Sequence, residues 1–119
     1  MPVMYKSTRG NGEVVTASVA ILKGLADDGG LFVPTEIPRM EKSFETLSRM
    51  SYQEIAYEVM KPYLSDFSDE ELNSCIARAY DKKFDIPKIA RIQRADDAYY
   101  LELFHGATIA FKDMALSIL

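Results

Sequence analysis

The sequence contains few of the residues that form disulfides or bind metals. It has one cysteine, Cys75, and one histidine, His105, in 119 residues. A single cysteine cannot form an internal disulfide, which agrees with a reducing compartment. A single histidine with no cysteine or second histidine at ligand spacing does not favour a metal site. We therefore expect no bound metal.

The sequence also lacks long apolar runs and a strong charge of one sign. No eighteen apolar residues are consecutive, and the first thirty residues do not join a cationic start to an apolar stretch, so neither a membrane span nor an export signal is expected. The net charge is -4, with scattered lysine and arginine, which does not favour nucleic acid as a partner. The cytoplasm is the expected compartment.

The composition is that of a folded protein, with 48% hydrophobic and 27% charged residues and no repeat or long linker. Apolar residues at helical spacing follow Thr16, and residues 27–30 (DDGG) are typical of a turn, so a helix of about ten residues is expected between them. Residues 31–33 predict a short buried strand, which Pro34 closes because proline has no N–H to donate.

Two capping boxes predict the starts of two further helices. Ser51 with Glu54 and Ser68 with Glu71 have the spacing at which serine and glutamate satisfy each other's backbone N–H groups, and Pro62 is expected to end the first helix. The expected buried faces are Tyr52, Ile55, Ala56 and Val59 on the first helix, and Leu72, Cys75, Ile76, Ala79 and Tyr80 on the second.

The last part of the chain predicts a strand followed by a helix. Residues 99–104 (YYLELF) are rich in β-forming aromatics, and apolar spacing over residues 111–119 predicts a helix after the turn at Gly106. The expected fold is therefore α/β, with several helices packed on a small sheet. The chain stops inside an expected helix without a cap or polar tail, so we expect it to be a truncated piece of a longer protein.

Potentially reactive side chains gather where this strand passes into this helix. They are Glu102, His105, Thr108, Lys112 and Asp113. Ligands of open α/β sheets tend to bind beyond the carboxyl ends of strands, where helix N-termini supply free N–H groups. Positive potential and desolvation there would favour the neutral amine of Lys112, the form that makes a Schiff base. Its spacing alone also fits an ordinary surface lysine, although apolar neighbours favour partial enclosure.

Three other features have both a functional and a structural interpretation. Residues 7–12 (STRGNG) could hold an anion or form a plain turn, and Asp27 with Asp28 could bind a metal or end a helix in solvent. Cys75 lies on an expected buried face, which favours a core side chain over a nucleophile. We assign none of them to the mechanism.

Four successive segments resemble signatures of the threonine synthase family. They are YKSTRGN (5–11), AILKGLADDGGLFVP (20–34), LSRMSYQEIAYEV (47–59) and LELFHGATIAFKDMAL (101–116). The last is the most specific, because phenylalanine, lysine and aspartate after HG-x-T is how that family presents its cofactor lysine. The order and separation of the segments extend the resemblance over nearly the whole chain.

The resemblance implies a fold type II pyridoxal-phosphate enzyme that converts O-phosphohomoserine and water to threonine and phosphate. It assigns Lys112 as the Schiff-base lysine that also moves protons on the substrate, with Phe111 and Asp113 beside it at the cofactor. It assigns His105 and Thr108 to the loop that leads to the lysine and towards the substrate.

The resemblance also implies an incomplete enzyme. Residues 1–98 would be an N-terminal domain and residues 99–119 the start of the cofactor-binding region, with the glycine-rich phosphate loop and the partner of the pyridine nitrogen beyond Leu119. Such a chain is expected to bind pyridoxal phosphate weakly, to be inactive alone, and to self-associate through a face meant for the missing part.

The family commonly has proline at the position of Ala107, so the loop is expected to be less rigid here. Two alternatives to a threonine synthase stay open. One is a catalytically silent relative that acts as a binding module, and the other is a different fold type II pyridoxal-phosphate lyase.

Overall fold

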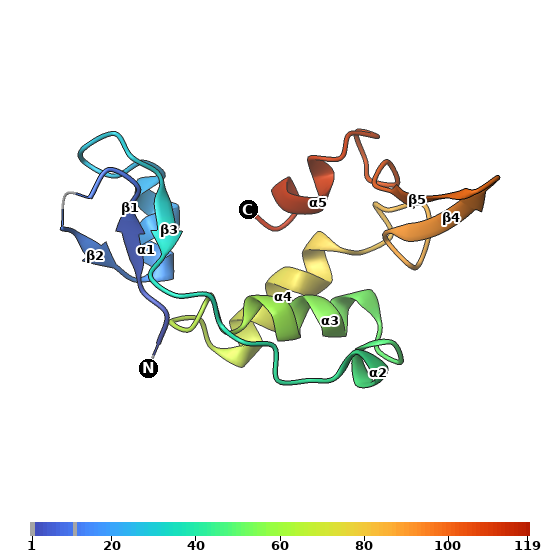
Figure 1. The fold of residues 1–119 in the computed structure, drawn as a ribbon, viewed down its shortest axis with the longest axis horizontal. Helices are drawn as coiled ribbons and strands as arrows, with labels where there is room; N and C mark the ends of the chain where they lie inside the picture. Colours follow the sequence, from blue (N-terminus) through green and yellow to red (C-terminus); the bar gives the residue numbers. More distant parts are fainter. Residues whose placement is uncertain (1, 11) are drawn as a thin grey trace.

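Short strands at the two ends of the chain are separated by helices (Figure 1). The structure, a computed structural model, describes residues 2–10 and 12–119. Asn11, in the loop 7–12 named above, lies outside the described residues. The elements are β1 (Tyr5–Ser7), β2 (Val14–Val15), α1 (Ala17–Lys23), β3 (Phe32–Pro34), α2 (Phe44–Leu47), α3 (Tyr52–Met60), α4 (Asp69–Ala79), β4 (Arg91–Ala95), β5 (Ala98–Glu102) and α5 (Asp113–Leu116). The expected mixed α/β class is confirmed.

The N-terminal sheet has the strand order β2-β1-β3, and both of its pairings are antiparallel. Its central strand β1 pairs Tyr5 with Val15 on one side and with Pro34 on the other. Strand β3 lies where residues 31–33 predicted a strand, although its side chains are half-buried rather than buried.

Helix α1 is shorter than expected. It starts after Thr16, whose hydroxyl accepts from the N–H of Val19, but it ends at Gly24 instead of continuing to residue 27. Gly24 adopts a φ of 72°, a conformation that glycine reaches without the steric cost other residues have. The next residue, Leu25, then forms an isolated bridge with Leu31.

Both predicted capping boxes are present. The Ser51 hydroxyl accepts from the N–H of Glu54, and the Glu54 carboxylate accepts from the N–H of Ser51. Ser68 and Glu71 make the same reciprocal pair at the start of α4. Helix α3 ends at Met60, before Pro62, as expected.

Helices α3 and α4 enclose the main core. The buried cluster consists of Ala56, Leu72, Ile76, Ala79, Tyr80, Phe84 and Ile89. The predicted buried face of α4 is confirmed except at Cys75, which is half-buried. On the predicted face of α3 only Ala56 is buried. Tyr52 and Ile55 are half-buried, and the expectation for Val59 was wrong, because this residue is 42% exposed. Only one narrow face of this short helix meets α4.

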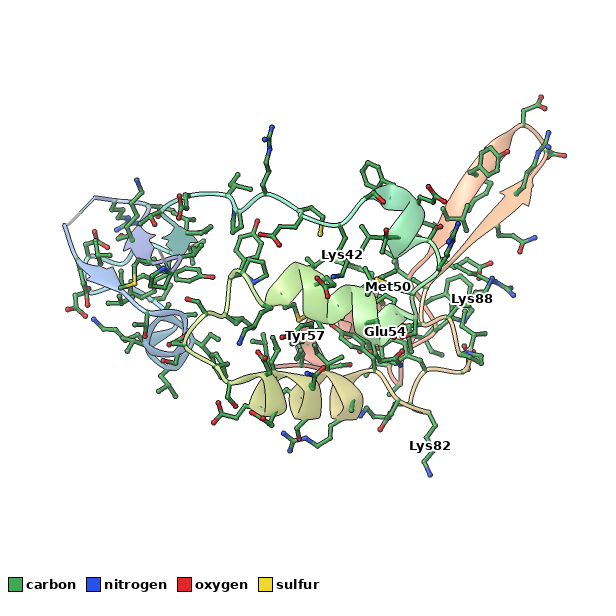
Figure 2. The ribbon with its side chains drawn as sticks, turned by 90° about the horizontal axis from the view of Figure 1, so that it is seen from below. Lys42, Met50, Glu54, Tyr57, Lys82 and Lys88 are labelled. Atoms are coloured by element: carbon green, nitrogen blue, oxygen red, sulfur yellow. The ribbon has the colours of Figure 1, made fainter. Side chains whose placement is uncertain are left out.

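Polar contacts fix α3 to its neighbours. Lys42, which lies in the segment before α2 (Figure 2), forms an ion pair with Glu58 of α3 at 3.3 Å. The side-chain amide of Gln53 donates to the carbonyl of Tyr80 at 2.6 Å, which joins the start of α3 to the end of α4. These contacts orient the helix pair on which α5 packs.

Strands β4 and β5 form a separate antiparallel hairpin that projects from the end of the molecule (Figure 1). Strand β5 accounts for most of the predicted strand 99–104, but β4 was not predicted. Every residue of β4 is exposed, and its charged sequence has none of the apolar alternation that marks a half-buried strand.

The last predicted helix, 111–119, forms only the single turn of α5. Met114 and Ile118 pack against the helical core, and the Tyr80 hydroxyl donates to the Met114 carbonyl at 2.7 Å. The core therefore determines where α5 lies.

The chain is elongated, with extents of 49 × 30 × 28 Å. Its radius of gyration of 16.4 Å exceeds the roughly 13.5 Å expected for a compact domain of this length. Within the described ranges, no helix is long and apolar enough to cross a membrane.

Candidate functional site

Lys112 occupies the N-cap position of α5, one residue before the helix rather than in its first turn. Its carbonyl accepts from the N–H of Leu116 at 2.8 Å, so its backbone is fixed by the helix that follows. Its side chain is exposed, and the expected partial enclosure is not found in this chain. The amine of Lys112 is therefore open to a reactant.

An apolar hollow of about 520 Å³ lies beside this lysine. It is lined by Leu103, Phe111, Lys112, Met114, Ala115 and Leu116. Phe111 is 65% exposed, so its ring is available to pack against a ligand. The hollow combines one amine with an apolar wall, which suits a flat ring that reacts with the amine.

The loop before Lys112 is organised by the residue after it. Asp113 is only 8% exposed, and its carboxylate accepts from the Thr108 N–H at 2.8 Å and from the Thr108 hydroxyl at 2.6 Å. A Cβ atom on Gly106 would lie 2.5 Å from the Cβ and Oδ2 of Asp113. Only glycine therefore lets the loop fold this closely onto the carboxylate.

Ile109, in the same loop, has a φ of 65°. This left-handed conformation costs a non-glycine residue about 1–2 kcal/mol, and it is rare for β-branched side chains. The Ile109 N–H donates to the Gly106 carbonyl at 3.1 Å, which closes the turn. The loop between Gly106 and Lys112 thus contains one strained backbone position, at Ile109.

His105 begins this loop and lies between two carboxylates. Its side chain is 5% exposed, with Nδ1 at 2.5 Å from Asp85 and Nε2 at 2.7 Å from Glu102. Arg91 of β4 donates to the same Glu102 oxygen at 2.6 Å. Arg91, Glu102, His105 and Asp85 thus form one continuous chain of charged groups.

The hydrogen bond that His105 donates to Glu102, and then the one it donates to Asp85, raise the pKa of His105 above its ordinary value, although desolvation opposes the shift. Arg91 is the main cause that lowers the pKa of Glu102, and His105 adds to it. Both pKa shifts favour the charged forms, the imidazolium of His105 and the carboxylate of Glu102.

The predicted site residues fall into three groups in the structure. Phe111 and Lys112 line the hollow, Thr108 and Asp113 bond to each other, and His105 faces Asp85 and Glu102. Sequence reasoning missed two charged residues of this chain of contacts, Asp85 beside His105 and Arg91 beside Glu102. Arg91 faces Glu102 across the hairpin, so a predicted hairpin would have found it. Asp85 lies 20 residues before His105 and has no signal in the local spacing.

Ser7 and Arg9, from residues 7–12, and Asp28, for which both a ligand-binding and a structural role were considered, have structural contacts. Asp28 accepts from the Ser7 hydroxyl at 2.7 Å and from the Gly30 N–H at 2.9 Å, and Arg9 donates to the Asp28 carbonyl at 2.9 Å. These bonds join the turn at residues 28–30 to the end of β1. The carboxylate of Asp28 is thus used in holding a turn.

Known proteins share both the sequence and the fold. Residues 4–80 match the family model of the threonine synthase N terminus. The threonine synthase of Schizosaccharomyces pombe is 43% identical over an alignment of 121 positions, which covers 98% of this chain and 23% of that protein. This chain belongs to the threonine synthase family.

Solved threonine synthases have the same arrangement of elements. The crystal structure of the yeast enzyme matches 97% of this chain with a TM-score of 0.87 and 34% identity, and the match covers 24% of that chain. The threonine synthase of Brucella melitensis, solved with pyridoxal phosphate bound, matches 98% of this chain with a TM-score of 0.86 and 35% identity, over 25% of its own length. This member of the family therefore spans about a quarter of the length of the threonine synthases that it matches.

Proposed function

We propose that the protein carrying this chain is a pyridoxal-phosphate-dependent threonine synthase that converts O-phospho-L-homoserine and water to L-threonine and phosphate. We further propose that Lys112 is the residue that bonds to the cofactor. The observation that carries the proposal is the exposed amine of Lys112 beside an apolar hollow, in a member of a family that includes a pyridoxal-phosphate-bound structure.

The residues present fit this cofactor. Pyridoxal phosphate needs an accessible amine for its aldehyde and an apolar surface for its ring. Lys112 offers the amine, and Phe111 offers an exposed aromatic ring in the wall of the same hollow. When bound, the cofactor supplies an electron sink for charge that develops on the substrate.

Each residue of the segment then has a physical task. Lys112 would hold the cofactor through its Nζ, and the free Nζ would move protons at the α, β and γ carbons of the substrate. The β carbon would lose a proton, phosphate would leave the γ carbon with the electron pair of the C–O bond, and the γ carbon would take a proton. The oxygen of water would then bond to the β carbon as hydroxyl, and the other proton of water would end on the released phosphate, so the atoms balance. Asp113 and Thr108 do not react; they hold the loop that places Lys112.

We assign residues 1–98 to the N-terminal domain and residues 99–119 to the start of the cofactor-binding region. Groups that hold the cofactor phosphate and the pyridine nitrogen would come from the remainder of the protein. The isolated 119-residue chain is expected to bind the cofactor weakly and to turn over nothing. Exposed apolar side chains near the end of the chain, Leu101, Phe111, Leu116 and Leu119, favour its self-association.

Reductive labelling tests the assignment of Lys112. The full-length protein is loaded with pyridoxal phosphate, reduced with borohydride and digested, and the modified lysine is identified by mass spectrometry. We expect the label on Lys112, and we expect Lys112→Ala to lose both the label and turnover. Lys82, which is exposed and points away from the helices (Figure 2), provides the control Lys82→Ala with normal labelling.

A label on another lysine, or near-normal turnover by the Lys112→Ala variant, would refute the assignment. Turnover of O-phosphohomoserine compared with that of serine and threonine separates a threonine synthase from a different lyase. A protein that binds the cofactor and turns over none of the three would support the silent binding module.

A further inference from the structure

Both ring nitrogens of His105 face carboxylates, although the side chain is almost fully buried. Asp85 reaches Nδ1 and Glu102 reaches Nε2, and the side chain of Glu102 is itself 12% exposed. An ionised carboxylate can only accept hydrogen bonds. Both ring nitrogens must then donate, so the arrangement requires an imidazolium with a proton on each nitrogen.

A main-chain hydrogen bond also joins Asp85 to His105. The N–H of Asp85 donates to the carbonyl of His105 at 3.0 Å. His105 is thus bound to Asp85 through both its side chain and its backbone, and to the hairpin through Glu102. These contacts fix the first end of the loop that runs from Gly106 to Lys112.

The second end of the loop is fixed by Asp113, which holds Thr108 and lies against Gly106. Lys112 lies between the two anchors. We propose that His105 is a positioning residue: as an imidazolium held by Asp85 and Glu102, it fixes the loop that presents Lys112. This inference rests on the proposed function of Lys112.

The same geometry assigns His105 no proton transfer with substrate. Neither ring nitrogen is available, because each already donates to a carboxylate. The charged groups facing the ring are Asp85 from the segment after α4 and Glu102 from β5, with Arg91 of β4 behind Glu102. Asp113 lies across Gly106 on the other side of the loop. The raised pKa of His105 agrees with this role.

The test compares His105→Gln with the wild-type full-length protein. A glutamine amide can donate from only one nitrogen, so it cannot bridge both carboxylates. We call the contacts of His105 with Asp85 and Glu102 the clamp. Without the clamp the loop should open locally, so we expect amide hydrogen exchange of peptide 106–112 in the cofactor-free protein to become roughly 10-fold faster. We expect the dissociation constant for pyridoxal phosphate, followed by the visible absorbance of the lysine-bound cofactor, to rise roughly 10- to 100-fold.

A second variant keeps the test decisive if His105→Gln does not fold. Asp85→Asn keeps the shape of an exposed side chain and removes one charge, so it should raise the same exchange rate roughly 5-fold. Asp97→Asn, on an exposed carboxylate in the hairpin turn, is the matched control and should change neither measurement.

The outcomes separate the two proposals. Unchanged loop exchange and unchanged cofactor absorbance, with turnover lost, would overturn the positioning role and indicate direct contact with substrate. Faster loop exchange, combined with a borohydride label on a different lysine, would support the clamp and refute the assignment of Lys112.

Discussion

Asp113 accepts two hydrogen bonds from Thr108, one from its backbone N–H at 2.8 Å and one from its hydroxyl at 2.6 Å. The two residues are five positions apart, and Lys112 lies between them. A buried carboxylate next to the lysine therefore determines the path of the chain that leads to it. Substitutions at Thr108, Gly106 or Asp113 should therefore shift the position of Lys112 without altering Lys112 itself.

The close approach of Gly106 to Asp113 predicts a coupled pair of substitutions. Gly106→Ala would place a methyl group 2.5 Å from the carboxylate, and we expect it to lower the free energy of unfolding by about 1–3 kcal/mol. Asp113→Ala should also destabilise by about 1–3 kcal/mol, because Thr108 loses its acceptor. In the double variant the clash with the carboxylate disappears and only the contact with the Cβ retained at position 113 remains, so the loss should be smaller than the sum. Urea unfolding measures all three.

Gly24→Ala is the control for this comparison of the two single variants with the double variant. Gly24 has a positive φ but no atom within 4 Å of an added Cβ, so its substitution is expected to cost about 1 kcal/mol. That cost should simply add to the cost of Asp113→Ala, because the sites are independent. Additive behaviour of Gly106→Ala with Asp113→Ala would show that the two residues are not in steric contact.

Tyr80 joins the last helix to the core, and the hydrogen bond from its hydroxyl is expected to stabilise the fold. Tyr80→Phe keeps the ring but removes the donor to the Met114 carbonyl, a bond of 2.7 Å. We expect a loss of about 1 kcal/mol in urea unfolding and faster amide exchange in α5. Burial raises the pKa of Tyr80 to about 12, so the hydroxyl stays a donor at neutral pH.

Tyr99→Phe is the matched control, because Tyr99 is 72% exposed on the hairpin. It should leave the free energy of unfolding unchanged. If Tyr80→Phe were equally silent, the hydroxyl would not be what holds α5 in place.

Local signals predicted the starts of two helices, since a capping box needs only residues three positions apart, but they missed α2 and overestimated the lengths of α1 and α5. Ser51 with Glu54 and Ser68 with Glu71 therefore indicated the starts of α3 and α4 correctly. The end of α1 was wrong because the apolar spacing continued beyond Gly24, whereas the backbone turned there.

The site was only partly predictable for a different reason. Phe111, Lys112 and Asp113 are adjacent, so their grouping follows from the sequence. The contact between Asp85 and His105 depends on how the segment after α4 returns past the hairpin. Strand β4 has no apolar pattern, and its turn at Asp96 lacks the Asn-Gly or Asp-Gly signal of a two-residue hairpin.

The capping boxes predict a third effect. Ser51→Ala and Ser68→Ala each remove the acceptor for an N–H group in the first helical turn, and each should cost about 1 kcal/mol in urea unfolding. Ser65→Ala, on an exposed serine between the two helices, is the control and should change little. If all three variants showed the same free energy of unfolding, the two caps would not contribute to stability.

The last prediction concerns pH. Hydrogen bonding to Glu102 and Asp85 raises the pKa of His105 in the folded protein above its unfolded value, which is about 6.5. The stabilisation is therefore fully present below about pH 6.5 and is lost as the pH rises through the folded pKa.

His105 is the only histidine in the chain, so the difference in unfolding free energy between wild type and His105→Gln isolates its titration. Measured by urea unfolding from about pH 5.5 to 9, where the carboxyl groups stay ionised, this difference should be largest and constant below about pH 6.5 and shrink as the pH rises above it. A difference that is flat or that grows with pH would mean that His105 is neutral between its two carboxylates, and the clamp around Lys112 would not be ionic.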